Sequence, residues 1–222
     1  MGIWLLAAFL TAPPPAALQS ARDQQDRTAL QKIIDESAAA AAKAPNDAGA
    51  HYRIALASSY LAEVALEQRD RKAAEQAATR GVKAAEQAIA LKPDVAEYYR
   101  VLGTLCGQVV PANVLAGLSY GKRAKEAIDK AIAMDPKSSA NYMARGVGNY
   151  YLPAALGGGP ELASADFHKA IDLDPKNADS WLWLGLALRK QNKDAEARKA
   201  FEKSLELNPR RLWAREQLDK TK

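Results

Sequence analysis

The segment that decides the fold spans residues 178–209 and reads ADSWLWLGLALRKQNKDAEARKAFEKSLELNP. Apolar residues recur at helical spacing over residues 181–188, and again over residues 197–204 after a polar break. This pattern predicts two short amphipathic helices that form a hairpin. Pro209 ends the second helix, because a proline removes a helical hydrogen bond. One hairpin cannot bury its apolar face alone, so further copies are expected upstream.

Three earlier segments repeat this pattern. Their closing halves share one spacing of four, three and five residues, ending at a proline: Gly81, Ala85, Ala88 and Pro93; Ala124, Ile128, Ala131 and Pro136; Ala163, Phe167, Ala170 and Pro175; and, in the last copy, Ala197, Phe201, Ser204 and Pro209. Their opening halves also correspond: His51, Ile54 and Ala55; Tyr99, Leu102 and Gly103; Tyr142, Arg145 and Gly146; Trp181, Leu184 and Gly185. Four copies of one pattern indicate an array of helical hairpins.

The pattern resembles the tetratricopeptide repeat, in which an aromatic residue, a Leu-Gly pair, an Ala, a second aromatic and a Pro recur over about 34 residues. The resemblance implies an all-α fold, a right-handed superhelical solenoid of helix-turn-helix hairpins with N- and C-terminal capping helices. Gly185 and Ala197 are small, so two helix backbones can approach closely. We expect Trp181 and Phe201 to fill the gap to the neighbouring hairpin.

We expect a single repeat domain at residues 22–222. It consists of a cap helix at 22–43, repeats at 48–93, 96–136, 139–175 and 178–209, and a cap helix at 210–220. In the last helix, Leu212, Trp213 and Leu218 should pack on the fourth repeat, while Arg211, Arg215 and Lys220 face water.

The second and third repeats carry insertions between their two helices. Residues 107–121 contain Pro111, Gly117 and Gly121, which predict a loop with turns. Residues 150–161 contain Gly-Gly-Gly followed by Pro160 and Glu161, which suit the first turn of the next helix. Both insertions are expected at the same edge of the array.

The first 21 residues carry no Lys, Arg, Asp or Glu, and residues 3–10 form an apolar run. This segment resembles a secretory signal peptide. The run is too short for a membrane span, which needs about 20 apolar residues. The Gly-rich corner at 157–161 also resembles a subgroup of bacterial exported repeat proteins. We therefore expect a periplasmic or secreted protein with no membrane span after signal removal, with a cytoplasmic protein as the alternative.

The net charge of +5 lies entirely within residues 189–222, which contain 11 basic and 6 acidic residues. Acids and bases alternate there, and no nucleic-acid motif accompanies them, so we expect a solvated surface and no nucleic-acid partner. A nucleic-acid or anionic-surface binder ranks last among the functional hypotheses. The lone Cys106 takes an apolar helix position and is expected to be buried.

No catalytic arrangement of residues is evident. His51 and His168 are the only histidines, and neither lies in a zinc-binding motif. The Gly-rich corner lacks the Gly-Lys-Ser/Thr ending of a phosphate-binding loop. We therefore expect no enzyme activity, no metal and no cofactor.

The resemblance implies a concave groove that binds a protein or peptide. Its expected lining comes from the first helix of each repeat: Tyr52, Leu56, Ser59, Arg100, Thr104, Gln108, Met143, Val147, Tyr150, Leu182, Leu186, Arg189 and Lys190. Such a face could hold an apolar segment with a carboxylate, bound by Arg100 or Arg189. The sequence leaves self-association open, and also leaves open that the N-terminal helix fills part of the groove.

The alternative function is the binding of a small molecule, as in a transport accessory protein. An edge pocket between residues 109–120 and 152–159 would hold the ligand, with Tyr120, Arg145 and Tyr151 as candidate contacts. Arg145 is unusual, because it stands where Leu or a similar apolar residue is expected.

Overall fold

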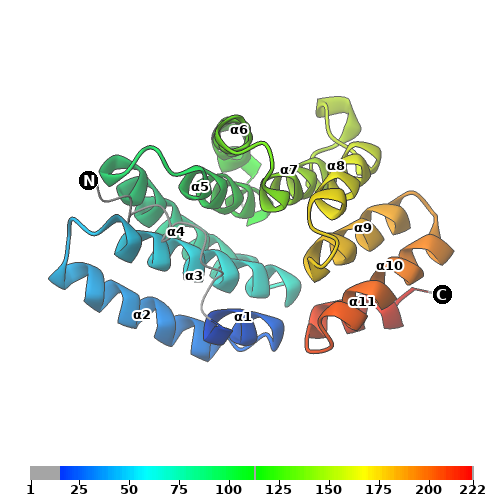
Figure 1. Ribbon diagram of the computed structural model, residues 1–222, viewed down its shortest axis with the longest axis horizontal. Coiled ribbons are helices and arrows are strands. Elements are labelled where there is room, and N and C mark those ends of the chain that lie inside the picture. Colours follow the sequence, from blue (N-terminus) through cyan, green and yellow to red (C-terminus); the bar gives the residue numbers. More distant parts are fainter. Residues whose placement is uncertain (1–15, 113, 222) are drawn as a thin grey trace, which may run out of the picture.

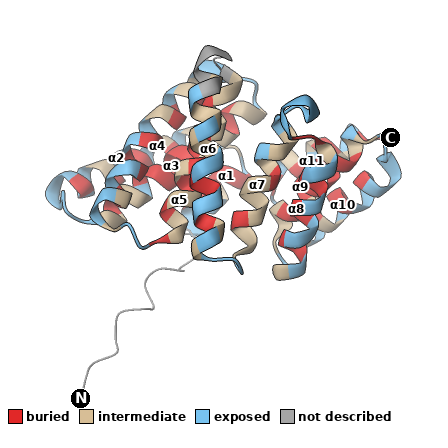
Figure 2. Ribbon diagram, turned by 90° about the horizontal axis from the view of Figure 1, so that it is seen from above, coloured by how far each residue is buried: buried red, intermediate tan, exposed pale blue. Residues whose placement is uncertain are grey.

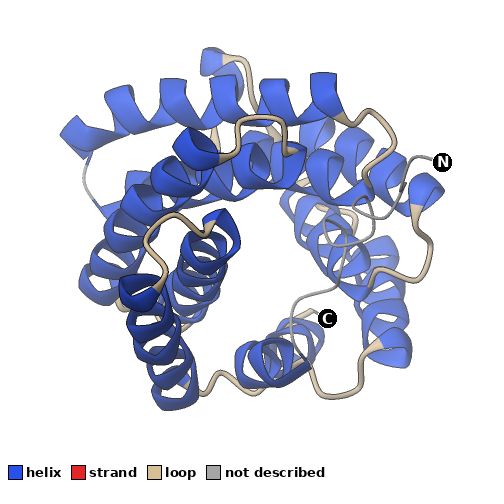
Figure 3. Cartoon of the chain, turned by 60° about the vertical axis from the view of Figure 1, so that its left-hand side comes forward, coloured by secondary structure: helices blue, strands red, loops and turns tan. Residues whose placement is uncertain are grey.

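The computed structural model describes residues 16–221 apart from residue 113, and the side chains of residues 112, 114–116 and 118 are outside that description. The apolar run expected in a signal peptide also lies outside the described residues. The described part is helical and contains no strand (Figure 3). Its α-helices are α1 (Ala16–Asp23), α2 (Arg27–Lys43), α3 (Ala48–Glu67), α4 (Arg71–Leu91), α5 (Ala96–Val109), α6 (Val114–Met134), α7 (Ser139–Tyr151), α8 (Pro160–Leu173), α9 (Ala178–Lys190), α10 (Asp194–Leu207) and α11 (Leu212–Asp219).

The helices form four consecutive hairpins, α3–α4, α5–α6, α7–α8 and α9–α10, with α2 packed on the first. The successive hairpins follow a curve, so that α1 and α11, which are far apart in sequence, lie near each other (Figure 1). The all-α solenoid predicted from the sequence is thereby confirmed.

Polar side chains start several of these helices. The Asp47 carboxylate accepts a hydrogen bond from Gly49 N at 2.8 Å, and that of Asp70 accepts one from Ala73 N at 3.0 Å. Asn177 Oδ1 accepts from the backbone N of residues 179 and 180. Each such cap satisfies a free N–H and typically contributes about 1 kcal/mol. The caps fix where each helix begins and therefore which side chains face inward.

Glycine allows the close approach of the two helices in each of the last three hairpins. A Cβ at Gly185 would lie 2.6 Å from Phe201 Cε1, and one at Gly146 would lie 2.5 Å from Phe167 Cε1. Gly103 has the same relation to Ile128, at 2.6 Å. Phe201 is fully buried. The predicted small-residue contact is therefore confirmed, although the aromatic ring packs within its own hairpin against the glycine.

The buried apolar side chains fall into two main clusters. Figure 2 marks the buried residues in red along the helices. The first core comes from α1 to α5, with Tyr120 and Ala124 of α6 packed against it. The second core comes from α8 to α11, with Met143, Val147 and Tyr150 of α7 packed against it. Among the described residues, the two cores share no member. The chain thus contains two packed bodies, α1–α6 and α7–α11.

Two expectations about helix ends were wrong. The expected cap helix at 22–43 is two helices, α1 and α2, because the chain turns at Gln25, whose φ is 55°. The expected turns at Gly117 and Gly121 are absent, since both glycines lie inside α6, which begins at Val114. Among the described residues there, the short 3-10 helix η1 (Val110–Ala112) interrupts the path between α5 and α6. Glycine reads as a turn in sequence, but helical neighbours outweigh its preference here.

The insertion of the third repeat has the structure that was predicted for it. Residues 152–159 leave the helical path through the 3-10 helix η2 (Ala154–Leu156), and Gly157 and Gly159 have φ of 85° and 114°. Pro160 then begins α8 in its first turn. Positive φ is a conformation that glycine adopts without strain.

The C-terminal helix differs from expectation at its start. Leu212 is 42% exposed, whereas Arg211, expected in water, is fully buried. Trp213 and Leu218 do pack against the second core. A long-range ion cluster, which has no local sequence pattern, accounts for the burial of Arg211.

Candidate functional site

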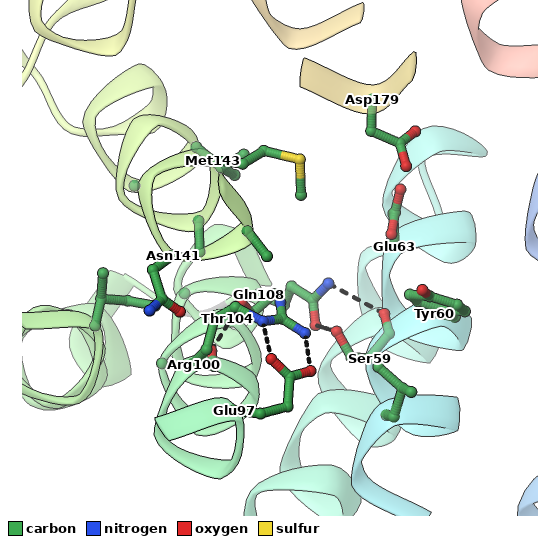
Figure 4. Close-up of a pocket in the computed structure, with 18 of the residues that line it drawn as sticks. Ser59, Tyr60, Glu63, Glu97, Arg100, Thr104, Gln108, Asn141, Met143 and Asp179 are labelled. Carbon is green, nitrogen blue, oxygen red and sulfur yellow. Dashed lines mark hydrogen bonds and ion pairs between the residues drawn. The ribbon is translucent and has the colours of Figure 1, made fainter. Parts of the chain in front are cut away.

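The concave side of the array encloses a cavity of about 2770 Å³. Helices α3, α5 and α7 line its walls, and α1, α9 and α11 contribute residues where the two ends of the array meet. Figure 4 shows part of this interior, with Arg100 and Thr104 of α5 facing Ser59 and Tyr60 of α3. We call this space the interior cavity.

The wall formed by α3 and α5 is polar and internally hydrogen-bonded. Arg100 donates to both carboxylate oxygens of Glu97, at 2.7 and 2.5 Å, and the Tyr52 hydroxyl donates to Glu97 at 2.9 Å. Gln108 Nε2 donates to the backbone oxygen of Ser59 at 3.1 Å, and Ser59 Oγ donates to Gln108 Oε1 at 3.3 Å. Burial, followed by the charge of Glu97, raises the pKa of Tyr52. Tyr52 therefore stays a neutral hydrogen-bond donor.

The two arginines expected to bind a partner carboxylate already have acceptors within the chain. Arg100 is held by Glu97, and Arg189 donates to the side-chain oxygen of Gln217 at 2.6 Å and to its backbone oxygen at 3.3 Å. Binding a carboxylate would require breaking these contacts. The expectation of a carboxylate-bearing segment stays a prediction that depends on this exchange of partners.

The opposite wall is apolar and aromatic. Met143 of α7 points into the interior toward α3 (Figure 4), and Val147 lines it one turn later. The Trp183 ring of α9 lies edge-on to Tyr151 and Trp213, with centroids 6.0 and 5.3 Å away. Tyr151 is 51% exposed. Within the described residues, part of this aromatic surface is left uncovered by the chain.

At one end of the interior cavity, charged side chains from both ends of the array form a buried group. We call it the closure cluster: Arg22, Asp23, Glu63, Glu67, Asp179 and Arg211.

The closure cluster joins α1 and α3 to α9 and the start of α11. Arg22 Nη1 donates to Asp179 Oδ2 at 2.6 Å, and Arg211 donates to Glu63 at 2.7 Å and to Glu67 at 3.1 Å. Beside it, Asn208 Nδ2 donates to Asp23 Oδ2 at 2.7 Å. These contacts join the two ends of the curved array, so that the array forms a closed ring.

The closure cluster holds four carboxyl groups and two guanidinium groups, so it has an excess of acid. Burial raises the pKa of Glu67 to about 7, although Arg211 acts against this rise. Burial also disfavours ionisation of Asp179, but Arg22 and Arg211 outweigh it and lower its pKa. The two carboxyl groups thus respond to burial differently, according to the number of cations beside them.

Most of the residues predicted for the groove line the interior cavity. They are Tyr52, Leu56, Ser59, Arg100, Thr104, Gln108, Met143, Val147 and Arg189. Leu182 and Leu186 do not line it, because they are buried in the second core with Phe167 and Ala214. Asp179 and Trp183 take the inward positions of α9 instead. The face of α9 that was predicted to line the cavity therefore differs from the observed face by a rotation of about one residue.

Tyr150 and Lys190 also lie outside the cavity lining. Tyr150 packs against the second core, and Lys190 Nζ donates to its backbone oxygen at 2.8 Å while lying 3.7 Å from its ring centroid. These two residues fix the end of α7 to the end of α9. The N-terminal helix α1 leaves the interior cavity unfilled, since it packs at its end through Leu18.

The candidate residues of the alternative edge pocket are brought together in part: Arg145 and Tyr151 line the interior cavity, and Tyr120 does not. Tyr120 packs against the first core, beneath Arg123. Tyr151 meets Trp183 on the other body. Arg145 donates to Asp166 of α8, with Nη2 2.6 Å from Oδ1. Within that predicted pocket, the side chains of residues 112–116 and 118 lie outside the described part of the chain.

In the described part of the chain, no group of three or more His, Cys, Asp or Glu side chains has a metal-binding arrangement. None of the described helices is both long enough and apolar enough to cross a membrane.

Two family models match the chain in adjacent segments. The model described as "Regulator of microtubule dynamics protein 1-3" matches residues 16–153, and a tetratricopeptide repeat model matches residues 157–211. The two matches meet in the loop between α7 and α8.

Solved structures are similar to this chain. A thermophilic tetratricopeptide repeat protein of Thermus thermophilus, TTC0263, is similar with a TM-score of 0.56 and 19% identity, over 86% of this chain and 98% of that chain. MamA from Desulfovibrio magneticus RS-1 is similar with a TM-score of 0.47 and 18% identity, over 89% of this chain and 98% of that chain. The repeat family and its fold are those of protein-interaction scaffolds, which are typically non-catalytic.

Proposed function

The chain belongs to the regulator of microtubule dynamics protein 1-3 family, and from this premise we propose that it is a scaffold that holds a segment of a protein partner in its interior cavity. The observation that carries the proposal is the aromatic and apolar wall of Met143, Val147, Tyr151 and Trp183, which borders a cavity of about 2770 Å³. That volume suits a peptide segment and exceeds the roughly 300–1,000 Å³ of a small-molecule site.

The chemistry of the walls describes the segment. The α3–α5 wall offers hydrogen-bonding groups that are already paired, and the α7–α9 wall offers apolar surface. An amphipathic segment with its apolar side toward α7 and α9 fits both walls, since it buries apolar area without displacing an ion pair. Such binding needs no catalytic group, metal or cofactor.

Site-specific photo-crosslinking tests the proposal. A photoreactive residue at Ala144, which lines the interior cavity, should capture the partner in extracts, and one at the exposed Ala133 of α6 should not. Met143→Glu should abolish capture from position 144 by placing a charge on the apolar wall. Leu162→Glu is the matched control, because Leu162 is 49% exposed on α8. Equal capture from both positions would contradict binding in the cavity.

We also propose that the protein is exported, on the basis of the apolar run at residues 3–10. Cleavage should then occur before Ala16, because Leu18 and Ala21 of α1 are packed in the first core. Sequencing the N-terminus of the protein from its source, with cell fractionation, tests this. An N-terminus at Met1 in the cytoplasmic fraction would contradict export.

The family match favours a second candidate function, regulation of microtubule dynamics by this chain. Co-sedimentation of the full chain with polymerised tubulin tests it, with Met143→Glu in parallel. Sedimentation that the substitution abolishes would identify a segment of tubulin as the partner segment held in the cavity. Absence of sedimentation would exclude this candidate and leave the scaffold proposal standing.

A further inference from the structure

The interior cavity lies between two bodies that are joined in different ways on its two sides. On one side the chain itself connects them, through the turn between α6 and α7. There the buried Asn141 donates from Nδ2 to the backbone oxygens of Ala131 and Asp135, both at 3.0 Å. On the other side, the bodies meet at the closure cluster.

The closure cluster is the weaker of the two connections in apolar terms. Near the turn, α7 of the second body packs on α5 and α6 of the first. Within the described part of the chain, the first and second cores are separate, so no buried apolar cluster spans the closure cluster. The contacts across this side are those of long polar side chains, Arg22 to Asp179, Arg211 to Glu63 and Glu67, and Asn208 to Asp23. A buried ion pair contributes little net stability, because desolvation offsets the attraction.

Two polar atoms in the closure cluster are incompletely satisfied. Arg211 Nε and Asp179 Oδ1 are both buried and make no hydrogen bond, although they lie 3.5 Å apart. Buried charged atoms that are paired without a hydrogen bond recover only part of their lost hydration, which disfavours the closed arrangement relative to one in which water reaches them. Separation of the bodies would hydrate all six charged groups while leaving both cores intact.

We propose that the two bodies move apart at the closure cluster, with the turn between α6 and α7 as the hinge, and that this motion opens the interior cavity along its side. A polypeptide can enter a closed ring only end first, whereas an open ring admits an internal segment sideways. The use of the opening for a partner rests on the proposed function, but the motion does not, so it is tested with no partner present.

The experiment measures distances between spin labels in the full chain, with Cys106 replaced by Ala. One pair, Gln24→Cys with Arg215→Cys, spans the closure cluster from exposed positions on either body. Two further pairs lie within single bodies, Gln24→Cys with Lys83→Cys and Glu161→Cys with Arg215→Cys. We expect Arg211→Gln to add a longer-distance population to the spanning pair and to leave both internal pairs unchanged.

Arg210→Gln is the matched control, because Arg210 is the exposed neighbour of the buried Arg211. It should leave all three distances as in the parent. An unchanged spanning distance in Arg211→Gln would overturn the proposal. Broadening of the internal pairs would also overturn it, since the closure cluster would then hold the bodies themselves together.

A milder variant decides the matter if Arg211→Gln does not fold. Asp179→Asn removes the charge that Arg22 faces but keeps a side chain of the same shape. We expect a smaller longer-distance population from this variant across the spanning pair only. A spanning distance identical to that of the parent would overturn the proposal in this case as well.

Discussion

The α9–α10 hairpin and the closure cluster join helices by opposite means. In the hairpin, Phe201 packs directly on Gly185, sixteen positions earlier in the chain, and the contact is wholly apolar. In the closure cluster, Arg211 reaches Glu63 and Glu67 from the other end of the array. The hairpin contact holds two helices permanently, whereas the closure cluster holds two bodies through ions that water can replace.

The stability of the repeats and the closure of the array have separate origins in this molecule. Apolar burial within the repeats supplies the folding free energy, at about 25 cal/mol per Å² of apolar surface. Ion pairs between the ends define which surfaces meet, and they contribute less net energy because each ion loses its hydration. Substitutions in the two regions should therefore differ in kind as well as in size.

The largest effect is expected from Phe201→Ala, which empties a fully buried site in the second core. The free energy of unfolding should fall by about 3–5 kcal/mol. Denaturant unfolding followed by circular dichroism measures it. Leu212→Ala is the control, because Leu212 is 42% exposed and its truncation leaves no cavity. Equal losses in the two variants would contradict the assignment of Phe201 to a tightly packed site.

The next effect is a pH dependence that belongs to the closure cluster. Burial raises the pKa of Glu67 to about 7 in the folded chain; Glu63 adds to the rise and Arg211 acts against it. In the unfolded chain the pKa of Glu67 is ordinary, so the folded chain binds the proton more tightly. The folded state therefore binds more protons between the two pKa values. Its stability should fall as pH rises from about 5 to about 8, by on the order of 2 kcal/mol.

Glu67→Gln isolates this contribution, since an amide does not titrate in that range. Unfolding free energies of the variant and the parent, measured in parallel at several pH values, should differ in slope between about pH 5 and 8. Lowering the pH further should weaken the closure cluster in both proteins, because Asp179, whose pKa is lowered by Arg22 and Arg211, then becomes protonated. Parallel slopes for variant and parent would contradict the pH prediction.

A smaller effect should come from Gly185→Ala, because the added Cβ would lie 2.6 Å from Phe201 Cε1. Overpacking of this kind costs about 1–3 kcal/mol. Gly148→Ala is the matched control on α7, where a Cβ meets nothing within 4 Å. It should stabilise the helix by about 0.5–1 kcal/mol. Thermal melts of the two variants should shift in opposite directions.

The smallest effect is an expected absence of change at Cys106. This thiol is fully buried in the first core, and burial raises its pKa to about 11. It should react slowly with a maleimide at neutral pH, since the reactive species is the thiolate. Arg211→Gln should leave that rate unchanged, because opening at the closure cluster keeps the first core closed. Faster labelling in this variant would show that the two regions are not independent.

The sequence predicted the features that depend on neighbours within one repeat. The pairing of Gly185 with Phe201, or of Gly146 with Phe167, follows from motif positions that recur within each helix, although the number of residues between the two members differs from copy to copy. The inward faces of α3 and α5, and that of α7 apart from Tyr150, followed from the same register. The face of α9 did not, because the last repeat packs beside a cap, where Leu182 and Leu186 are buried with Ala214.

The closure cluster could not be predicted, because its members are spread from residue 22 to residue 211. Arg211 has the sequence context of an exposed cap residue, since Pro209 and Arg210 precede it. Glu63 and Glu67 are four residues apart on α3, a spacing common on solvated helix faces. Whether Arg211 reaches Glu63 and Glu67 depends on the curvature of the whole array, which cannot be derived from the sequence of one repeat.

The closed ring limits how this chain can change in evolution. Open solenoids gain or lose whole repeats readily, because each repeat contacts only its neighbours. Here an inserted or deleted repeat would carry Arg211 away from Glu63 and Glu67 and leave buried charges without counterions. The number of repeats is thereby fixed, and point substitutions inside the cavity remain the route by which such a chain can acquire a new partner.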